Sequence, residues 1–350
     1  IYLRISAVTG SIEAPRIDGD GPVIDWAVCM RRFDPDAILS RLVDRIDGQL
    51  IETLATEVAR FHQTIERCDL AASFGSADAA YAPMLQNLAT IERHAPRAAA
   101  ALAPLKAWTA AQRRRLGSVL EARKQAGHVR ECHGDLHLGN VALIDDRPVV
   151  FDAIEFNPGL RWIDTISDTA FMTMDLQERE RPDLAYRYLS RYLQHTGDYE
   201  GLSVLRFYEV YRALVRAKIA AIRVGQSDLD APMRRGVCAE LDAYLAFARR
   251  LTVPQHGAVI ITVGVSGSGK SHLSRSLPDS LPAVCLRSDL ERKRLLGVDP
   301  LSDATARGAY TPESTARTYA RLESLTREVV GAGYVAVVDA TFLRRGQRAA

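Results

Sequence analysis

The residues best suited to chemistry lie in one stretch, from His133 to Asn140, with the sequence HGDLHLGN. Asp135 and Asn140 have the spacing D-x-x-x-x-N, and a second aspartate, Asp152, follows twelve residues after Asn140 behind the apolar run Val149–Phe151. Phosphoryl transfer uses such a set. One Asp takes the proton of the attacking hydroxyl, while an Asn and a second Asp hold the magnesium that bridges the nucleotide phosphates. A polar turn between two strands is the alternative, but it requires the spacing, the strand and Asp152 to agree by chance.

A second phosphate-binding pattern lies between Gly264 and Ser271, and it matches the Walker A motif G-x-x-x-x-G-K-[ST] at every fixed position. It follows an apolar, β-branched run and precedes a helical pattern, which is the context the motif requires. The backbone amides would cradle the phosphates, the lysine would reach the β and γ oxygens, and the last serine would offer its hydroxyl to magnesium. A glycine-rich turn without a ligand is the weaker alternative. The expected nucleotide ligands are Gly264, Gly267, Ser268, Gly269, Lys270 and Ser271.

Two carboxylates follow the next apolar runs of this region, Asp289 after 283–286 and Asp339 after 334–338. In an open α/β sheet ligands bind at the carboxyl ends of the strands, so both should face the phosphates. Asp289 is then expected to take the proton of an acceptor hydroxyl, and Asp339 to assist the magnesium. Either residue could instead cap the start of a helix. The cluster 292–294 either binds an acidic acceptor or forms an exposed helix face, and the second interpretation is slightly favoured.

Composition limits the class of protein. The chain has 350 residues, enough for two domains, and a formal net charge of +2, which argues against a dedicated nucleic-acid binder without excluding a local basic groove. Five scattered cysteines form no C-x-x-C pair and indicate reduced thiols in a cytoplasmic protein. Cys132, next to the first motif, is expected to be a buried filler rather than a reactive thiol. No apolar run is long enough to span a membrane.

The pattern of apolar residues predicts the elements that position these groups. A hairpin is expected from strands at 1–8 and 23–30, and another around Asp145-Asp146. Helical spacing occupies 36–69 with a break at Gly48, and 84–126 with interruptions at Pro96 and Pro104. Four further helices are expected near 165–176, 180–195, 200–224 and 232–250. We therefore predict an α+β domain over 1–251, a Pro/Gly linker over 252–257, and an α/β domain with a parallel sheet over 258–350.

The first motif resembles the aminoglycoside phosphotransferase and choline kinase type of small-molecule kinase, with His133-Gly134-Asp135 where protein kinases have His-Arg-Asp. Residues 287–289 and 338–345 resemble the small P-loop kinases related to polynucleotide and gluconate kinases. Together, the chain resembles bacterial fusions described as bifunctional aminoglycoside phosphotransferase/ATP-binding proteins. The resemblance implies a protein-kinase-like fold followed by a P-loop NTPase domain, with ATP and Mg²⁺ as cofactors. It makes Asp135 the catalytic base, Asn140 and Asp152 metal ligands, and His133 and Asp168 supports of the catalytic loop.

The sequence also departs from these families. No glycine loop, strand lysine or helical glutamate precedes Ile1, and two strands and a lid are missing after the third strand of the P-loop domain. We therefore expect a kinase-like domain with a truncated small lobe and a C-terminally incomplete P-loop domain, in a fragment that transfers little phosphate by itself. The expected activity of the longer protein is phosphoryl transfer from ATP to a small hydroxylated acceptor. The alternatives are a nucleotide-binding regulatory protein with a pseudokinase domain, and a polynucleotide-kinase-like enzyme.

Overall fold

The computed structural model describes residues 1–226, 229–302 and 310–349 of the chain. These residues form two compact units, one made of Ile1–Ile46 with Leu138–Phe151 and the other of Asp47–His137 with Asp152–Ala350. The first unit contains the last three residues of the HGDLHLGN stretch, Leu138 to Asn140. The second contains Asp135, Asp152 and the whole Walker A motif.

The first unit consists of two small antiparallel sheets and short 3₁₀ turns. One sheet has the order β2-β1-β3, so the predicted hairpin is confirmed and gains a short third strand. The other is the β5–β6 hairpin, whose turn residues Asp145 and Asp146 have φ of 49° and 58°, as two-residue hairpin turns demand. The elements are β1 (Tyr2–Gly10), β2 (Pro15–Ile17), β3 (Val23–Met30), η1 (Pro35–Ala37), η2 (Leu39–Arg41), η3 (Val43–Arg45), η5 (Leu138–Asn140), β5 (Val141–Ile144) and β6 (Arg147–Val150).

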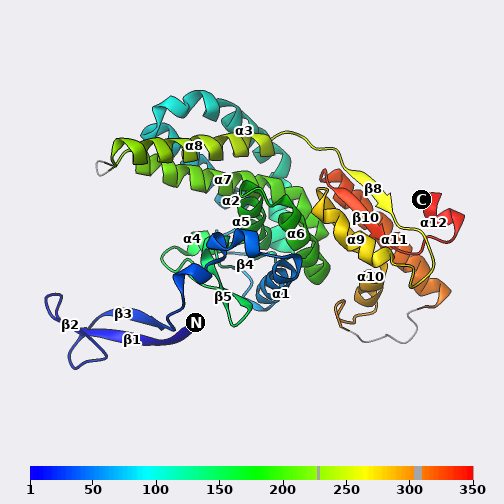
Figure 1. Cartoon of the computed structure of the whole chain (residues 1–350), viewed down its shortest axis with the longest axis horizontal. Helices are drawn as coiled ribbons and strands as arrows, with labels where there is room; N and C mark the ends of the chain where they lie inside the picture. The colour runs from blue at the N-terminus through cyan, green and yellow to red at the C-terminus, as the bar shows by residue number, and fades with distance from the viewer. Residues whose placement is uncertain (227–228, 303–309, 350) are drawn as a thin grey trace. The chain divides into compact units, whose positions relative to one another are not determined.

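The second unit opens with a helical region that also holds two short paired strands, β4 and β7 (Figure 1). The four helices predicted after residue 164 are confirmed as α5 to α8. Helix α7 packs along both α5 and α8, and most of its residues are buried. The elements are α1 (Gly48–Thr64), α2 (Ala77–His94), η4 (Pro96–Ala98), α3 (Ala99–Gln125), β4 (Val129–Glu131), α4 (Pro158–Arg161), β7 (Trp162–Asp164), α5 (Thr165–Glu178), α6 (Pro182–Thr196), η6 (Tyr199–Gly201), α7 (Leu202–Val224) and α8 (Ala231–Leu251).

Two of the helical predictions are wrong in detail. The apolar residues before Gly48 lie in three 3₁₀ turns instead of a helix, because apolar residues three apart suit both periods. Pro104 lies inside α3 without interrupting it. Its neighbours Leu102 and Leu105 are fully buried, so their packing offsets the hydrogen bond that the proline removes.

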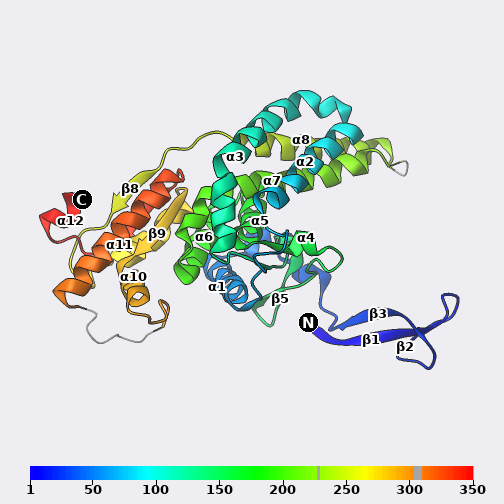
Figure 2. The same ribbon diagram turned by 180° about the vertical axis from the view of Figure 1, so that it is seen from behind.

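The P-loop region is a three-layer α/β arrangement. The predicted parallel sheet is confirmed, and its strand order is β8-β10-β9. Because crossovers are right-handed, the helix leading from β8 to β9 and the helix leading back to β10 must cover opposite faces. Helix α9 accordingly lies in front of the sheet in Figure 1, and α11 lies in front of it in Figure 2. The segment 252–257 ahead of β8 forms no helix or strand. The elements are β8 (Ala258–Ile261), α9 (Lys270–Ser276), η7 (Leu277–Asp279), β9 (Ala283–Arg287), α10 (Ser288–Leu295), α11 (Pro312–Gly331), β10 (Val335–Asp339) and α12 (Arg345–Ala349).

Helix α6 of the helical region covers the outer edge of strand β9. Ser190 Oγ accepts the amide hydrogen of Cys285 at 3.1 Å, and Gln194 Nε2 donates to the carbonyl of the same residue at 3.2 Å. An edge strand left open can pair with another chain. Two side chains of α6 therefore satisfy the backbone groups that a further strand would otherwise bind.

Candidate functional site

The loop that carries Asp135 leaves strand β4, which pairs antiparallel with β7. Gly134 has φ of 84°, and a Cβ at this position would lie 2.6 Å from the carbonyl oxygen of Leu160. Backbone conformation and space thus both require glycine here. Asp135 comes next, and its amide donates to His133 Nδ1 at 3.2 Å.

Asp168, in the first turn of α5, binds the backbone of this loop. Its side chain is fully buried, and its two carboxylate oxygens accept the amide hydrogens of His133 and Gly134 at 2.8 and 2.9 Å. Burial by itself would raise the pKa of Asp168, but the hydrogen bond and charge of His62, with the charges of His133 and Arg212, lower it. A buried, ionised carboxylate therefore fixes the backbone on the N-terminal side of Asp135.

Two further residues hold the same loop, and sequence reasoning missed both roles. Arg212, in α7, donates to the carbonyl of Gly134 at 2.7 Å and to the carbonyl and hydroxyl of Ser167 at 3.1 Å each. His62, in α1, lies 3.3 Å from Asp168 through Nε2 and 2.9 Å from the Tyr192 hydroxyl through Nδ1. In the sequence, the one indication of these roles is that both residues lie on apolar helix faces.

These loop contacts leave the side chain of Asp135 partly exposed, at 36%. His137 Nε2 lies 3.4 Å from its Oδ2. Asp152, an exposed residue of the same unit, has φ of 64°, a conformation that few side chains other than Asn and Asp accept. In the first unit, Asn140 is buried, and its backbone carbonyl accepts the amide hydrogen of Phe151 at 3.0 Å.

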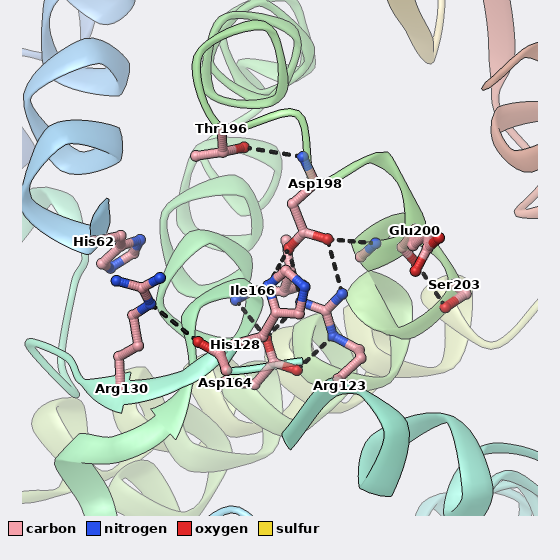
Figure 3. A network of polar contacts seen from close by, with 12 residues as sticks. His62, Arg123, His128, Arg130, Asp164, Ile166, Thr196, Asp198, Glu200 and Ser203 are labelled. Carbon is pink, nitrogen blue, oxygen red and sulfur yellow. Dashed lines mark hydrogen bonds and ion pairs between the residues drawn. The ribbon is translucent and has the colours of Figure 1, made fainter. Parts of the chain in front are cut away.

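Asp168 depends in turn on a buried ion-pair network centred on Arg123 of α3 (Figure 3). The guanidinium binds Asp164 through two hydrogen bonds of 2.6 and 2.8 Å and Asp198 through two of 2.7 and 2.9 Å. Asp164 also caps α5 by accepting the amide hydrogen of Ile166 at 2.9 Å. Since α5 carries Asp168 one turn later, the network fixes the helix that supports the Asp135 loop.

The network predicts how acid affects stability. Burial alone would raise the pKa of Asp164, but the charge and hydrogen bonds of Arg123 outweigh it and lower the pKa. The unfolded chain therefore binds the proton more readily than the folded one, and the carboxylate stabilises the fold above about pH 4, the usual pKa of aspartate. This contribution is lost as the pH falls through the lower pKa of the folded state.

We therefore expect the stability deficit of Asp164→Asn relative to the wild type to stay constant from pH 7 to pH 5. The deficit should shrink below about pH 4, where the wild-type carboxylate also becomes neutral. Chemical denaturation at a series of pH values measures it. A deficit that is unchanged down to pH 2 would contradict an ionised Asp164 in the folded state.

One group of described residues has three potential metal-ligand atoms close together, His62, Cys132 and Asp168, within 4.8 Å of one another. The histidine and the aspartate already bind each other, and Asp168 also accepts two loop amides. Burial raises the pKa of the Cys132 thiol well above its usual value. This group therefore serves as a support of the loop, and Cys132 is a buried filler.

The second candidate site is a cavity of about 680 Å³ formed around the Walker A motif. Gly264, Gly267 and Gly269 have φ of 149°, 79° and 83°, in the region that favours glycine. Lys270 Nζ donates to the loop carbonyl of Val265 at 2.6 Å. The cavity brings together residues that are far apart in the sequence, and those expected from the motif and the strands are Gly267, Gly269, Lys270, Ser271, Asp289 and Asp339.

Neither aspartate caps a helix. Helix α10 begins at Ser288 with Arg287 as its N-cap, and no side chain caps it. Asp289 instead accepts two hydrogen bonds from Arg287, at 2.7 and 3.2 Å. Asp339 ends strand β10, is buried, and lies beside the Thr262 hydroxyl at 3.5 Å. The capping alternative is therefore wrong for both residues.

The basic cluster at 292–294 is not the exposed helix face that sequence analysis favoured. All three residues are half-buried and engaged: Arg292 lines the P-loop cavity and stacks over Tyr310 at 5.1 Å, and Arg294 donates to the carbonyl of Gln194 at 2.6 Å. Lys293 donates to the carbonyl of Ser302. Of these three basic residues, Arg292 is the one that lines the cavity and could contact a ligand there.

Comparison with known families gives two matches. The model of the phosphotransferase enzyme family matches residues 3–208, and the model of an AAA domain matches residues 259–350. The first covers most of the hairpin sheet, the Asp135 loop and helix α5, which carries Asp168. The second covers the Walker A motif and all three parallel strands.

Related proteins are found among mycobacteria. Uncharacterized proteins from Mycobacterium tuberculosis and Mycobacterium bovis are each 28% identical over 344 aligned residues, which cover 93% of this chain. The chain spans 66% of the length of these relatives. Among solved structures, an ethanolamine kinase from Plasmodium vivax is 15% identical with a TM-score of 0.38, and the match covers 60% of this chain and 63% of that one.

Proposed function

The chain belongs to the phosphotransferase enzyme family, and from this premise we propose that the protein phosphorylates a hydroxyl group of a small acceptor with ATP. The observation that carries the proposal is the rigid support of the Asp135 loop. Asp168 and Arg212, both buried, bind the backbone of residues 133 and 134 on either side. A buried ion pair costs desolvation energy, and its use to fix one short loop is typical of a catalytic group that must be positioned.

Asp135 acts as the general base in this proposal. The acceptor oxygen forms a bond to the γ-phosphorus while the bond between that phosphorus and the β–γ bridging oxygen breaks, and ADP leaves. The proton of the acceptor hydroxyl passes to the Asp135 carboxylate. His133 supports the base by accepting its amide hydrogen, which aligns the loop before the acceptor binds.

The residues proposed to hold magnesium offer oxygen atoms, the donors that this ion prefers. They are Asn140 and Asp152 for the kinase-like domain and Ser271 and Asp339 for the P-loop domain. Ser271 and Asp339 line the same cavity, which suits a shared ion there. Magnesium would neutralise charge that develops on the transferring phosphoryl group.

We further propose that the P-loop domain binds a second ATP, with Asp289 as the base for an acceptor of its own. We place the boundary between the domains at 252–257, where no helix or strand occurs, with the kinase-like domain over 1–251 and the P-loop domain over 258–350. A cytoplasmic location is supported by five cysteines that are all free. None of the helices in the described part of the chain combines the length and apolar character that crossing a bilayer demands.

Lys270→Ala is expected to weaken nucleotide binding to the P-loop domain by about tenfold to a hundredfold. A hydrogen bond between an ammonium and a phosphate contributes about 1.5–3 kcal/mol, and 1.4 kcal/mol corresponds to a factor of ten. Calorimetry with a non-hydrolysable ATP analogue and Mg²⁺ should show two sites in the wild type and one tight site in the variant. Lys106→Ala, which removes a surface lysine paired with Glu92, is the control. Two tight sites in Lys270→Ala would exclude the Walker A loop as a nucleotide site.

The proposed activity can be tested by screening the full-length protein for ATP consumption. Pooled sugars, amino alcohols, hydroxy acids, sugar phosphates, nucleosides and oligonucleotides cover the alternatives raised by the sequence. Consumption that depends on a small hydroxylated compound and on Asp135 supports the proposal. ATP binding without transfer to any pool would favour the pseudokinase alternative, and transfer only to oligonucleotide ends would favour the polynucleotide-kinase alternative.

A further inference from the structure

We infer that the acceptor of the kinase-like domain is a hydroxylated small molecule that carries a negative charge, and not a polyamine. The inference rests on the proposed function and concerns a second cavity, also of about 680 Å³, in the helical region. We call it the acceptor cavity. Its walls come from α2, α7 and the segment that runs from α4 into α5, all within one compact unit.

The acceptor cavity adjoins the Asp135 loop. Arg212, one of its lining residues, donates to the carbonyl of Gly134 at 2.7 Å, and the carbonyl of Leu160, another, closes against Gly134. Tyr211 also lines the cavity. Burial raises the pKa of Tyr211, while the charge of Arg212 lowers it and that of Asp135 raises it. A molecule bound here would therefore lie against the loop that carries Asp135, the residue proposed to take its proton.

The described residues of the cavity wall carry more positive than negative charge. Its charged lining residues are Asp164, Arg212 and Lys218. The carboxylate of Asp164 is engaged by Arg123, and the guanidinium of Arg212 is engaged by Gly134 and Ser167. Lys218 is half-buried and has no hydrogen bond or ion pair with any residue that the structure describes. A partly desolvated ammonium without a counter-ion is unfavourable, and an anionic group on the ligand would compensate it.

A second donor on the same wall lacks a partner. Asn87, on α2, is only 2% exposed, and its Nδ2 has no hydrogen-bond acceptor among the described residues. Buried donors are nearly always paired, so an unpaired one that lines a cavity indicates where a ligand oxygen binds. Lys218 and Asn87 are thus two hydrogen-bond donors that oxygen atoms of a ligand could satisfy.

The remaining walls suit a flat or apolar ligand body. Trp162, Tyr208 and Tyr211 line the cavity with aromatic rings. Among the described lining residues the one carboxylate is that of Asp164, and it is already paired with Arg123, so it is not left to receive an amine. A carboxylate or a phosphate monoester on a hydroxylated ring compound therefore fits the cavity, whereas an aminoglycoside would bring several cations to a wall that already has an unpaired one.

The test compares four probes that share a hydroxylated ring body: glucose, glucuronate as the carboxylate probe, glucose 6-phosphate, and the aminoglycoside kanamycin. Binding to the full-length protein is measured by calorimetry, and ATP-dependent transfer is measured in parallel. We expect an anionic probe to bind at least tenfold more tightly than glucose, and kanamycin not to bind. The ratio of the carboxylate to the phosphate probe identifies which anion the cavity takes.

Lys218→Met and Lys218→Arg are the variants, and Lys106→Met is the matched surface control. Lys218→Met should weaken the anionic probe about tenfold or more and leave glucose unchanged, while Lys218→Arg should restore most of the affinity. Melting temperatures close to that of the wild type show that the variants fold. Equal affinity for charged and neutral probes, no binding of either anionic probe at millimolar concentration, or an anionic affinity unaffected by Lys218→Met would overturn the inference.

The same data separate this inference from the proposed function. If an anionic probe binds in a way that depends on Lys218 but no transfer depends on Asp135, the acceptor cavity is supported and the kinase activity is contradicted. If Asp135 is needed for transfer to glucose or kanamycin and Lys218→Met has no effect on it, the kinase activity is supported and the anionic acceptor is contradicted.

Discussion

Asp135→Asn in the full-length protein is expected to slow phosphoryl transfer by about two to four orders of magnitude, the usual contribution of a general base. The carboxamide keeps the shape of the side chain but cannot take the acceptor proton. Nucleotide affinity should hardly change, because the base faces the acceptor rather than the phosphates. The loop itself should persist, since its anchors bind the backbone of His133 and Gly134 and not the side chain of Asp135.

Single-turnover rates in a Lys270→Ala background measure this effect, because the P-loop site is then silenced. Asp78→Asn, which changes an exposed aspartate in a surface ion pair with Arg113, is the matched control and should have the wild-type rate. A rate for Asp135→Asn within a factor of a few of the wild type would remove Asp135 from the mechanism.

Arg123→Met is expected to destabilise the helical region by about 3–5 kcal/mol, the cost of leaving buried carboxylates without their partner. Arg123 is 4% exposed and binds Asp164 and Asp198 with two hydrogen bonds each. Although burial by itself would lower the pKa of Arg123, the two carboxylates raise it well above its usual value, so the guanidinium stays charged. Chemical denaturation followed by circular dichroism measures the loss.

The control for Arg123 is Arg113→Met, which breaks the exposed pair with Asp78 and should cost less than about 1 kcal/mol. Neutralising the partners as well, in Arg123→Met with Asp164→Asn and Asp198→Asn, should recover part of the stability because no buried charge is then unpaired. If Arg123→Met and Arg113→Met have equal effects, the network does not hold the helices that position Asp168.

The sequence predicted those parts of the structure that depend on local patterns. The Walker A glycines, the apolar runs of β8 to β10 and the amphipathic spacing of α5 to α8 are each encoded by neighbouring residues. The error before Gly48 has the same origin, because residues spaced by three suit a 3₁₀ turn as well as an α-helix. The capping interpretation of Asp289 failed because the helix begins one residue earlier than the aspartate.

The contacts missed by sequence reasoning join residues that are distant in the chain. His62 and Asp168 are 106 residues apart, and Arg123 and Asp198 are 75 apart. Nothing in the local sequence of a buried arginine or histidine identifies its partner. Lys218 illustrates the same limit, since a lysine on a helix is ordinarily solvated. Only the packing of α7 shows that it lines a cavity and has no counter-ion within the described part of the chain.

Whether phosphate is transferred at the Asp135 loop can be decided by following product formation in four proteins. The wild type, Asp135→Asn, Lys270→Ala and the double variant are each incubated with Mg-ATP and an acceptor identified by the screen. Phosphorus NMR then follows the new phosphate monoester. We predict that the ester forms with the wild type and with Lys270→Ala but not with either protein that lacks Asp135. Ester formation by Asp135→Asn at the wild-type rate, together with its loss in Lys270→Ala, would contradict transfer at the Asp135 loop and assign the transfer to the P-loop.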